Sequence, residues 1–116
     1  MRRTVLIVDD HARFRAAARA LLEAGGFEVV GEAEDGASAV AAAAALRPEV
    51  VLLDIQLPDL DGFAVAAQLP EDGPTVVLTS SRNASSFRGR LAAHPDWRFI
   101  AKSELSGETV ADAVAG

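Results

Sequence analysis

The sequence predicts an α/β protein whose strands form one parallel sheet with helices on both faces. Short apolar, β-branched runs such as Val5–Val8 and Val50–Leu53 are typical of strands that are buried on both sides. Segments of helical length, several of them rich in alanine, lie between these runs. Five successive strand-then-helix units imply parallel pairing, because each helix carries the chain back across the sheet.

The predicted strands are short apolar runs bounded by turn-forming or charged residues. In chain order they are Thr4–Val8, Glu28–Val30, Val50–Asp54, Thr75–Thr79 and Phe99–Ala101. The predicted helices are Ala12–Ala24, Gly36–Leu46, Phe63–Leu69, Ser85–Ala93 and Glu104–Ala115.

Apolar spacing and helix-ending residues support these helices individually. The first helix carries an apolar face that includes Phe14, Ala18, Leu21 and Leu22, and Gly25-Gly26 ends it. Pro48 closes the second helix. Ser85–Ala93 is the weakest, because Gly89 interrupts it and only two large apolar side chains, four residues apart, support it.

Composition bounds the class of protein. The chain has 116 residues, enough for one domain with a real core, and no internal linker or repeat divides it. A formal charge of −6 argues against nucleic acid or an anionic membrane as a direct partner. The absence of cysteine excludes disulfides and thiolate metal sites. The first apolar run is too short for a signal peptide or a membrane span, so we expect a cytoplasmic protein.

Acidic residues follow two of the predicted strands directly. Asp9 and Asp10 come after the first strand, and Asp54 ends the third. Neighbouring parallel strands of an open α/β sheet end at one edge, where such folds bind ligands. Three carboxylates in one small volume repel each other unless a cation is bound there. The spacing therefore predicts a divalent cation and chemistry on oxygen.

Two further polar residues follow strands at the same edge. Thr79 ends the fourth strand and Lys102 follows the fifth. Acids at a strand end are more often solvated turn or helix-cap residues, so no one of these positions is informative alone. Together, carboxylates suited to Mg²⁺ and a hydroxyl and an ammonium suited to phosphoryl oxygens favour a phosphoryl-transfer site.

The chain resembles a response-regulator receiver domain over essentially its whole length. The segments that carry the resemblance are VLIVDD with His11, LLDIQLPDLDG, VVLTS and FIAKS. The stretch DDHARFR is similar to receivers that are joined to helix-turn-helix output domains. The resemblance implies one receiver domain over residues 1–116, with a flavodoxin-like doubly wound sheet in the strand order 2-1-3-4-5.

Carried over to this sequence, the resemblance makes Asp54 the phosphoacceptor, which attacks a phosphohistidine on a sensor kinase. It implies a Mg²⁺ ion that is bound by Asp10 and Asp54, by Asp9 through water, and by the backbone carbonyl of Gln56.

The resemblance also implies how the signal spreads. Thr79 would bond the phosphoryl group, Lys102 would pair with it, and Phe99 would be the aromatic residue that turns inward on activation. The surface near the fourth helix and the fifth strand would change as a result. We expect a phosphoaccepting signalling domain, which can catalyse its own phosphorylation and dephosphorylation, rather than a turnover enzyme.

The partners that the resemblance implies are a sensor histidine kinase or a phosphotransfer protein and an output partner that the sequence does not identify. No direct contact with nucleic acid or membrane is expected, and a homodimer is compatible with the sequence. A free-standing receiver is expected rather than one excised from a DNA-binding regulator.

Two segments depart from the pattern of the family. Ala93–Arg98 replaces the usual Gly-Ala-x-Gly segment, which leaves the form of the fourth helix and the following loop open. Ser103 replaces the proline that is common after the lysine, and we expect a trans bond there, since a cis bond without proline costs about 2.5–4 kcal/mol. His11 is interpreted as a helix-start residue rather than a metal ligand, and His94 as a surface residue.

Three alternatives remain. An aspartate-nucleophile phosphatase also uses a strand-end aspartate with Mg²⁺ but needs a second acid two residues later, where this chain has Gln56. A flavodoxin-type flavin domain would need a phosphate-binding loop where Asp9 and Asp10 would repel the ligand. A pseudo-receiver scaffold should have lost part of the acid, threonine and lysine set, and none of it is missing.

Overall fold

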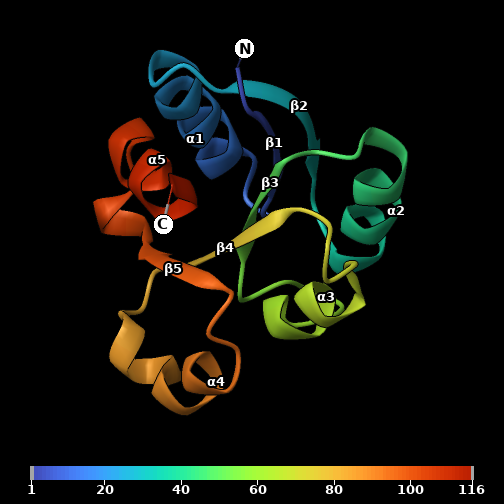
Figure 1. The fold of residues 1–116 in the computed structure, drawn as a ribbon, viewed down its shortest axis with the longest axis vertical. Helices are drawn as coiled ribbons and strands as arrows, with labels where there is room; N and C mark the ends of the chain where they lie inside the picture. The colour runs from blue at the N-terminus through green and yellow to red at the C-terminus, as the bar shows by residue number, and fades with distance from the viewer. Residues whose placement is uncertain (1, 116) are drawn as a thin grey trace.

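A five-stranded parallel sheet forms the centre of the computed structural model, which describes residues 2–115 (Figure 1). The strands are β1 (Thr4–Val8), β2 (Glu28–Ala33), β3 (Val50–Asp54), β4 (Thr75–Ser80) and β5 (Arg98–Ala101). Their order across the sheet is β2-β1-β3-β4-β5, and every neighbouring pair is parallel. The predicted fold class and strand order are therefore confirmed, and β1 and β3 are neighbours.

Helices cover both faces of the sheet (Figure 1). The helices are α1 (Ala12–Ala24), α2 (Gly36–Leu46), α3 (Gly62–Gln68), α4 (Arg88–Ala93) and α5 (Gly107–Ala115), with 3₁₀ turns at Ala84–Phe87 and Lys102–Glu104. Buried residues of α1 and α5 pack on one face of the sheet, and those of α2 and α3 on the other. No helix in the described part of the chain is long and apolar enough to cross a bilayer.

Successive side chains of the central strands point to opposite faces of the sheet, so these strands contribute to two separate cores. Val5 and Ile7 of β1 pack with α1 and α5, whereas Leu6 and Val8 pack with α2 and α3. The strand β3 divides in the same way, and each of its five residues is buried. A strand that is covered on both faces needs apolar residues at successive positions, so the unbroken apolar runs of the sequence follow from the layered fold.

The bounds of β2 and α5 differ from the prediction by three residues each, whereas those of α3, β4 and β5 differ by one residue. The strand β2 runs three residues further, because Gly31–Ala33 pair with the end of β1 although Glu32 is exposed. The helix α5 begins only at Gly107, because the hydroxyl of Ser106 accepts the Thr109 N–H at 3.0 Å and caps the helix there. The α1 residue Leu21, expected on the apolar face, is 41% exposed.

The predicted weak helix over Ser85–Ala93 is split in two. A 3₁₀ turn, Ala84–Phe87, precedes the six-residue helix α4, and neither part contains a buried residue. Phe87 and Leu91, four residues apart, are its two apolar contacts with the core. All described peptide bonds are trans, so the expectation for Ser103 is confirmed.

Candidate metal centre at the carboxyl edge of the sheet

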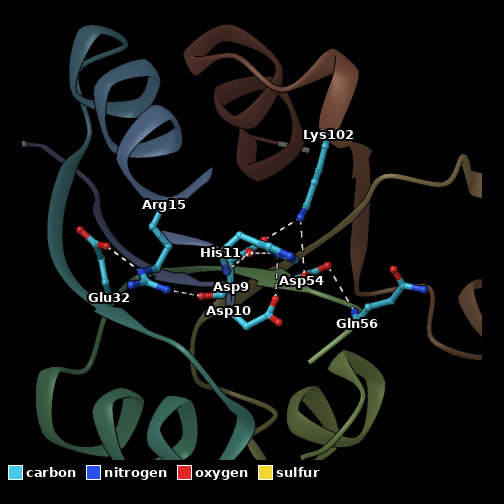
Figure 2. Close-up of polar contacts among 8 residues, drawn as sticks. All are labelled: Asp9, Asp10, His11, Arg15, Glu32, Asp54, Gln56 and Lys102. Carbon is cyan, nitrogen blue, oxygen red and sulfur yellow. Dashed lines mark hydrogen bonds and ion pairs between the residues drawn. The ribbon is translucent and has the colours of Figure 1, made fainter. Parts of the chain in front are cut away.

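Three carboxylates converge where β1 and β3 end side by side. Asp9 and Asp10 follow β1, and Asp54 is the last residue of β3. One ligand atom from each of them, together with one ring nitrogen of His11, lies within 4.8 Å of the others (Figure 2). Asp9 is fully buried and Asp54 is 3% exposed, so water screens their mutual repulsion poorly.

The side chain of Lys102, which directly follows β5, reaches this cluster from above in the view of Figure 2. Its Nζ lies 2.7 Å from Asp9 Oδ2 and 3.6 Å from Asp54 Oδ2, and 4.2 Å from the ring centroid of Phe14. The ammonium therefore lies over the face of the Phe14 ring of α1 as well as beside the acids. One ammonium against three carboxylates leaves an excess of negative charge.

The protonation of Asp54 reflects this excess. Burial and the nearby charge of Asp9 raise the pKa of Asp54 from the ordinary value of 3.8 to about 6, while Lys102 and the backbone N–H of Gln56 act in the opposite direction. The carboxylate form therefore costs free energy in the protein alone. A bound cation would remove that cost, and in this respect the donor set fits a divalent metal.

Thr79 lies beside Asp54 in the register of β3 and β4. Neighbours in register point their side chains to the same side of a parallel sheet, so the hydroxyl lies next to the carboxylate. Its Oγ1 is buried and has no hydrogen-bond partner among the described residues. Since buried polar groups are almost always paired, an unpaired hydroxyl here fits a ligand oxygen as its partner.

The loop after β3 is held close to Asp54. The backbone N–H of Gln56 donates to Asp54 Oδ1 at 3.2 Å, and the N–H of Gly62 donates to the carbonyl of Ile55 at 2.8 Å. A Cβ at Gly62 would lie 2.6 Å from the Asp54 carbonyl oxygen, so only glycine permits this approach. The Gln56 side chain is exposed and points away from the acids in Figure 2.

Phe99 lies outside the cluster. It pairs in register with Leu78, one position before the pair formed by Ile100 and Thr79. Its ring is half-buried. The ring centroid lies 5.9 Å from that of Phe87, the last residue of the 3₁₀ turn before α4. The predicted inward turn of Phe99 on activation stays a prediction.

Sequence reasoning missed two residues that shape the site. The guanidinium of Arg15 donates through Nη1 to the backbone carbonyl of Asp9 at 2.7 Å, and its Nε lies 3.0 Å from Glu32 Oε1 (Figure 2). This contact fixes the peptide that joins Asp9 to Asp10. Neither residue follows a strand at the carboxyl edge, so the pattern that identified the other site residues could not indicate them.

The fold and the site together define a class of protein: a doubly wound α/β domain with an acid, lysine and threonine cluster at the carboxyl edge of its sheet. The family model of the response regulator receiver domain matches residues 5–114. The chain therefore belongs to the response regulator receiver family, whose members are domains of two-component signalling systems.

Similar proteins agree with this family. A Pseudomonas aeruginosa protein named as a transcriptional regulator is 40% identical over 114 residues, which are 96% of this chain and 55% of that protein. BvgA of Bordetella pertussis, named as a transcription regulator of virulence factors, is 37% identical over 91% of this chain and 52% of its own length. The chain thus spans about half the length of these curated relatives.

Solved structures match the fold as a whole. The signal receiver domain of the response regulator NarL from Mycobacterium tuberculosis has a TM-score of 0.78 at 32% identity, covering 99% of this chain and 98% of that one. The structure titled as the CheX-CheY-BeF3-Mg complex from Borrelia burgdorferi has a TM-score of 0.78 at 25% identity, covering 96% of this chain and 85% of that one.

Proposed function

We propose that this chain is a phosphoaccepting receiver in which Asp54 takes a phosphoryl group from a phosphohistidine in the presence of Mg²⁺. The observation that carries this proposal is the convergence of Asp54 with two further acids and Lys102, directly beside the unpaired hydroxyl of Thr79. Each of these groups has a use in phosphoryl transfer, and together they lie beside the carboxylate of Asp54.

Mg²⁺ is the ion that fits this donor set, because hard oxygen ligands are available and the cluster carries excess negative charge. Asp10 and Asp54 would bind it directly, Asp9 through water, and the backbone carbonyl of Gln56 would complete the protein ligands. When bound, the ion supplies positive charge for the phosphoryl oxygens and favours the carboxylate form of Asp54. The Borrelia neighbour, whose title includes both Mg²⁺ and the phosphoryl mimic BeF3, supports this proposal.

Asp54 is the nucleophile of the transfer, and two other residues bind the phosphoryl oxygens. The Asp54 carboxylate attacks phosphorus, an O–P bond forms, the N–P bond of the phosphohistidine breaks, and its electron pair stays on the imidazole. Lys102 pairs with one phosphoryl oxygen, and Thr79 donates its free hydroxyl hydrogen to another. The phosphoryl group adds about −1.5 to −2 charges, so these contacts exist only in the phosphorylated state and favour it.

The partners follow from this chemistry. The phosphoryl donor is a sensor histidine kinase or a phosphotransfer protein in the cytoplasm, and the surface near α4 and β5 changes for an output partner. An aspartate-nucleophile phosphatase is less well supported, because exposed Gln56 supplies no acid at the position where those enzymes need one. A pseudo-receiver scaffold is less well supported as well, since no member of the acid, threonine and lysine set is lost.

Intact mass after incubation with acetyl phosphate and Mg²⁺ tests the proposal. We expect one added phosphoryl group in the parent, none without Mg²⁺, and none in Asp54→Asn, which keeps the size of the side chain. Asp59→Asn is the matched control, since Asp59 lies in the same loop but its carboxylate binds the start of α2. An unmodified parent, or equal modification of Asp54→Asn, would refute the assignment.

A further inference from the structure

His11 follows the two acids of β1 and begins α1, but its side chain does not cap that helix. It occupies the N-cap position without a side-chain hydrogen bond to the helix. Its ring instead turns toward the acids, with Nδ1 3.0 Å from Asp10 Oδ1 and 3.2 Å from Asp9 Oδ1 (Figure 2). The prediction of a helix-start residue is correct for the backbone only.

One ring nitrogen of His11 lies close enough to the acids to share a metal ion with them. Four ligand atoms, from His11, Asp9, Asp10 and Asp54, lie within 4.8 Å of one another. Ligands around one transition-metal ion lie at most about 4.2 Å apart, twice a metal–ligand distance of about 2.1 Å. The side chain of His11 is 71% exposed, so its ring is free to make the small shift that closes this difference.

We propose that His11 is an additional metal ligand beside those of the proposed Mg²⁺ site and that the site therefore binds divalent transition metals such as Ni²⁺, Co²⁺ or Zn²⁺ more tightly than Mg²⁺. Mg²⁺ prefers oxygen ligands, whereas imidazole nitrogen suits the later transition metals. The inference rests on the proposed function, because the same acids bind the cation in both. The buried, unpaired hydroxyl of Thr79 beside Asp54 independently marks this edge as a ligand site.

One other role would explain the same contacts. The imidazole N–H could simply donate to the two carboxylates, as a neutral substitute for a cation, and would then have to leave when a metal binds. The two roles predict opposite effects of removing the ring. A ligand's loss weakens the binding of transition metals, whereas the loss of a competing donor strengthens the binding of every cation.

The composition of the chain makes a sharp experiment practicable. Histidine and cysteine are the residues that most often bind transition metals. The sequence has two histidines and no cysteine, so His94 is the other residue of these two types. His94 is exposed and stacks on Trp97 with ring centroids 3.9 Å apart, and it is absent from the acid cluster. His94→Ala is therefore the matched control for His11→Ala.

Isothermal titration of untagged protein with Ni²⁺ and, separately, with Mg²⁺ at one fixed pH tests the inference, because metal affinity depends on pH. His11→Ala should weaken Ni²⁺ binding at least about tenfold, since even the loss of a group that only supports a metal ligand costs about 10–100-fold. Mg²⁺ affinity should change far less, and His94→Ala should match the parent for both ions. In proton NMR spectra, substoichiometric Ni²⁺ should broaden the ring signals of His11 before those of His94.

Unchanged or tighter Ni²⁺ binding in His11→Ala would overturn the role of His11 and leave the proposed function intact if the parent still binds Mg²⁺. A parent that binds Ni²⁺ through His11 but does not bind Mg²⁺ would overturn the metal part of the proposed function and leave the ligand role intact. Binding of neither ion would overturn both.

Discussion

The ammonium of Lys102 lies closer to Asp9 than to Asp54, at 2.7 Å from one carboxylate and 3.6 Å from the other. Without a bound ion, Lys102 therefore forms its shorter ion pair with Asp9, which is fully buried. Asp54 keeps a raised pKa although a lysine is near. A phosphoryl group on Asp54 would attract the same ammonium. Lys102 would then be drawn both to Asp9 and to the phosphoryl group.

Removal of that ammonium should leave Asp9 as a buried, unpaired charge. We expect Lys102→Ala to lower the free energy of unfolding by about 3 kcal/mol, as for other buried pairs that lose one partner. Urea denaturation in the presence of a chelator measures this loss. In an Asp9→Asn background the same substitution should cost much less, because the unpaired charge is gone. Equal losses in both backgrounds would show that the pair is not what stabilises the protein.

The contribution of Asp54 to stability without metal should fall as pH rises from about 4 to about 6. The folded-state pKa of Asp54 is raised to about 6 from 3.8, so the folded protein holds its proton more tightly than the unfolded chain does. Asp54→Asn removes this effect and should be more stable than the parent above pH 6, by up to about 3 kcal/mol. The difference should vanish below about pH 4. Urea midpoints measured across this range in a chelator test it, and a variant that is no more stable at neutral pH would contradict it.

Asp59 should show the opposite pH dependence. Backbone N–H groups of Gly36 and Ala37 donate to its carboxylate at 2.7 and 3.0 Å and lower its pKa, although some loss of hydration acts against them. The carboxylate thus joins the loop after β3 to the start of α2. Asp59→Asn should lose stability at neutral pH, and its difference from the parent should disappear as pH falls through the lowered pKa. A difference of the same size at acidic pH would exclude this charge effect.

Two glycines should respond to alanine with opposite signs. A Cβ at Gly62 would lie 2.6 Å from the Asp54 carbonyl oxygen and 2.8 Å from Ile55 Cα, so Gly62→Ala should cost well over 1 kcal/mol and displace the loop beside Asp54. A Cβ at Gly89 in α4 would meet nothing within 4 Å, so Gly89→Ala should stabilise the protein by about 0.5–1 kcal/mol through helix propensity. Thermal melts of both variants test the pair, and a stabilised Gly62→Ala would contradict the packing described.

Trp97 should report a change of state at the acid cluster. Its ring lies 6.0 Å from that of Phe63 in α3, the helix that follows the Asp54 loop, and both Trp97 and Phe99 pack on the same core. We expect its emission spectrum to differ between Mg²⁺ alone and Mg²⁺ with beryllofluoride. Asp54→Asn, which lacks the acceptor carboxylate, should show no difference. Identical parent spectra, with beryllofluoride binding measured separately, would mean that this segment does not take part in the switch.

Much of the fold was predictable from the sequence because the determining patterns are local. Unbroken apolar runs mark strands that are covered on both faces, and β1 and β3 have the predicted bounds. The predicted bounds of a strand or helix were wrong where contacts with another segment determine them. Pairing with β1 extends β2 past Val30, and the Ser106 cap delays α5. The segment around α4 has little to bury, so its division into a 3₁₀ turn and a short helix depends on contacts with β5 and α3.

The sequence by itself determined that Asp9, Asp10, Asp54, Thr79 and Lys102 share one edge, because parallel strands all end on the same side of a sheet. Only the tertiary structure decided which atoms meet. It set Lys102 nearer to Asp9 than to Asp54, left the Thr79 hydroxyl unpaired, turned the ring of His11 toward the acids and brought Arg15 to the Asp9 carbonyl. The physical reason is that side-chain orientation depends on neighbours that are distant in the chain, and a linear pattern does not contain those contacts.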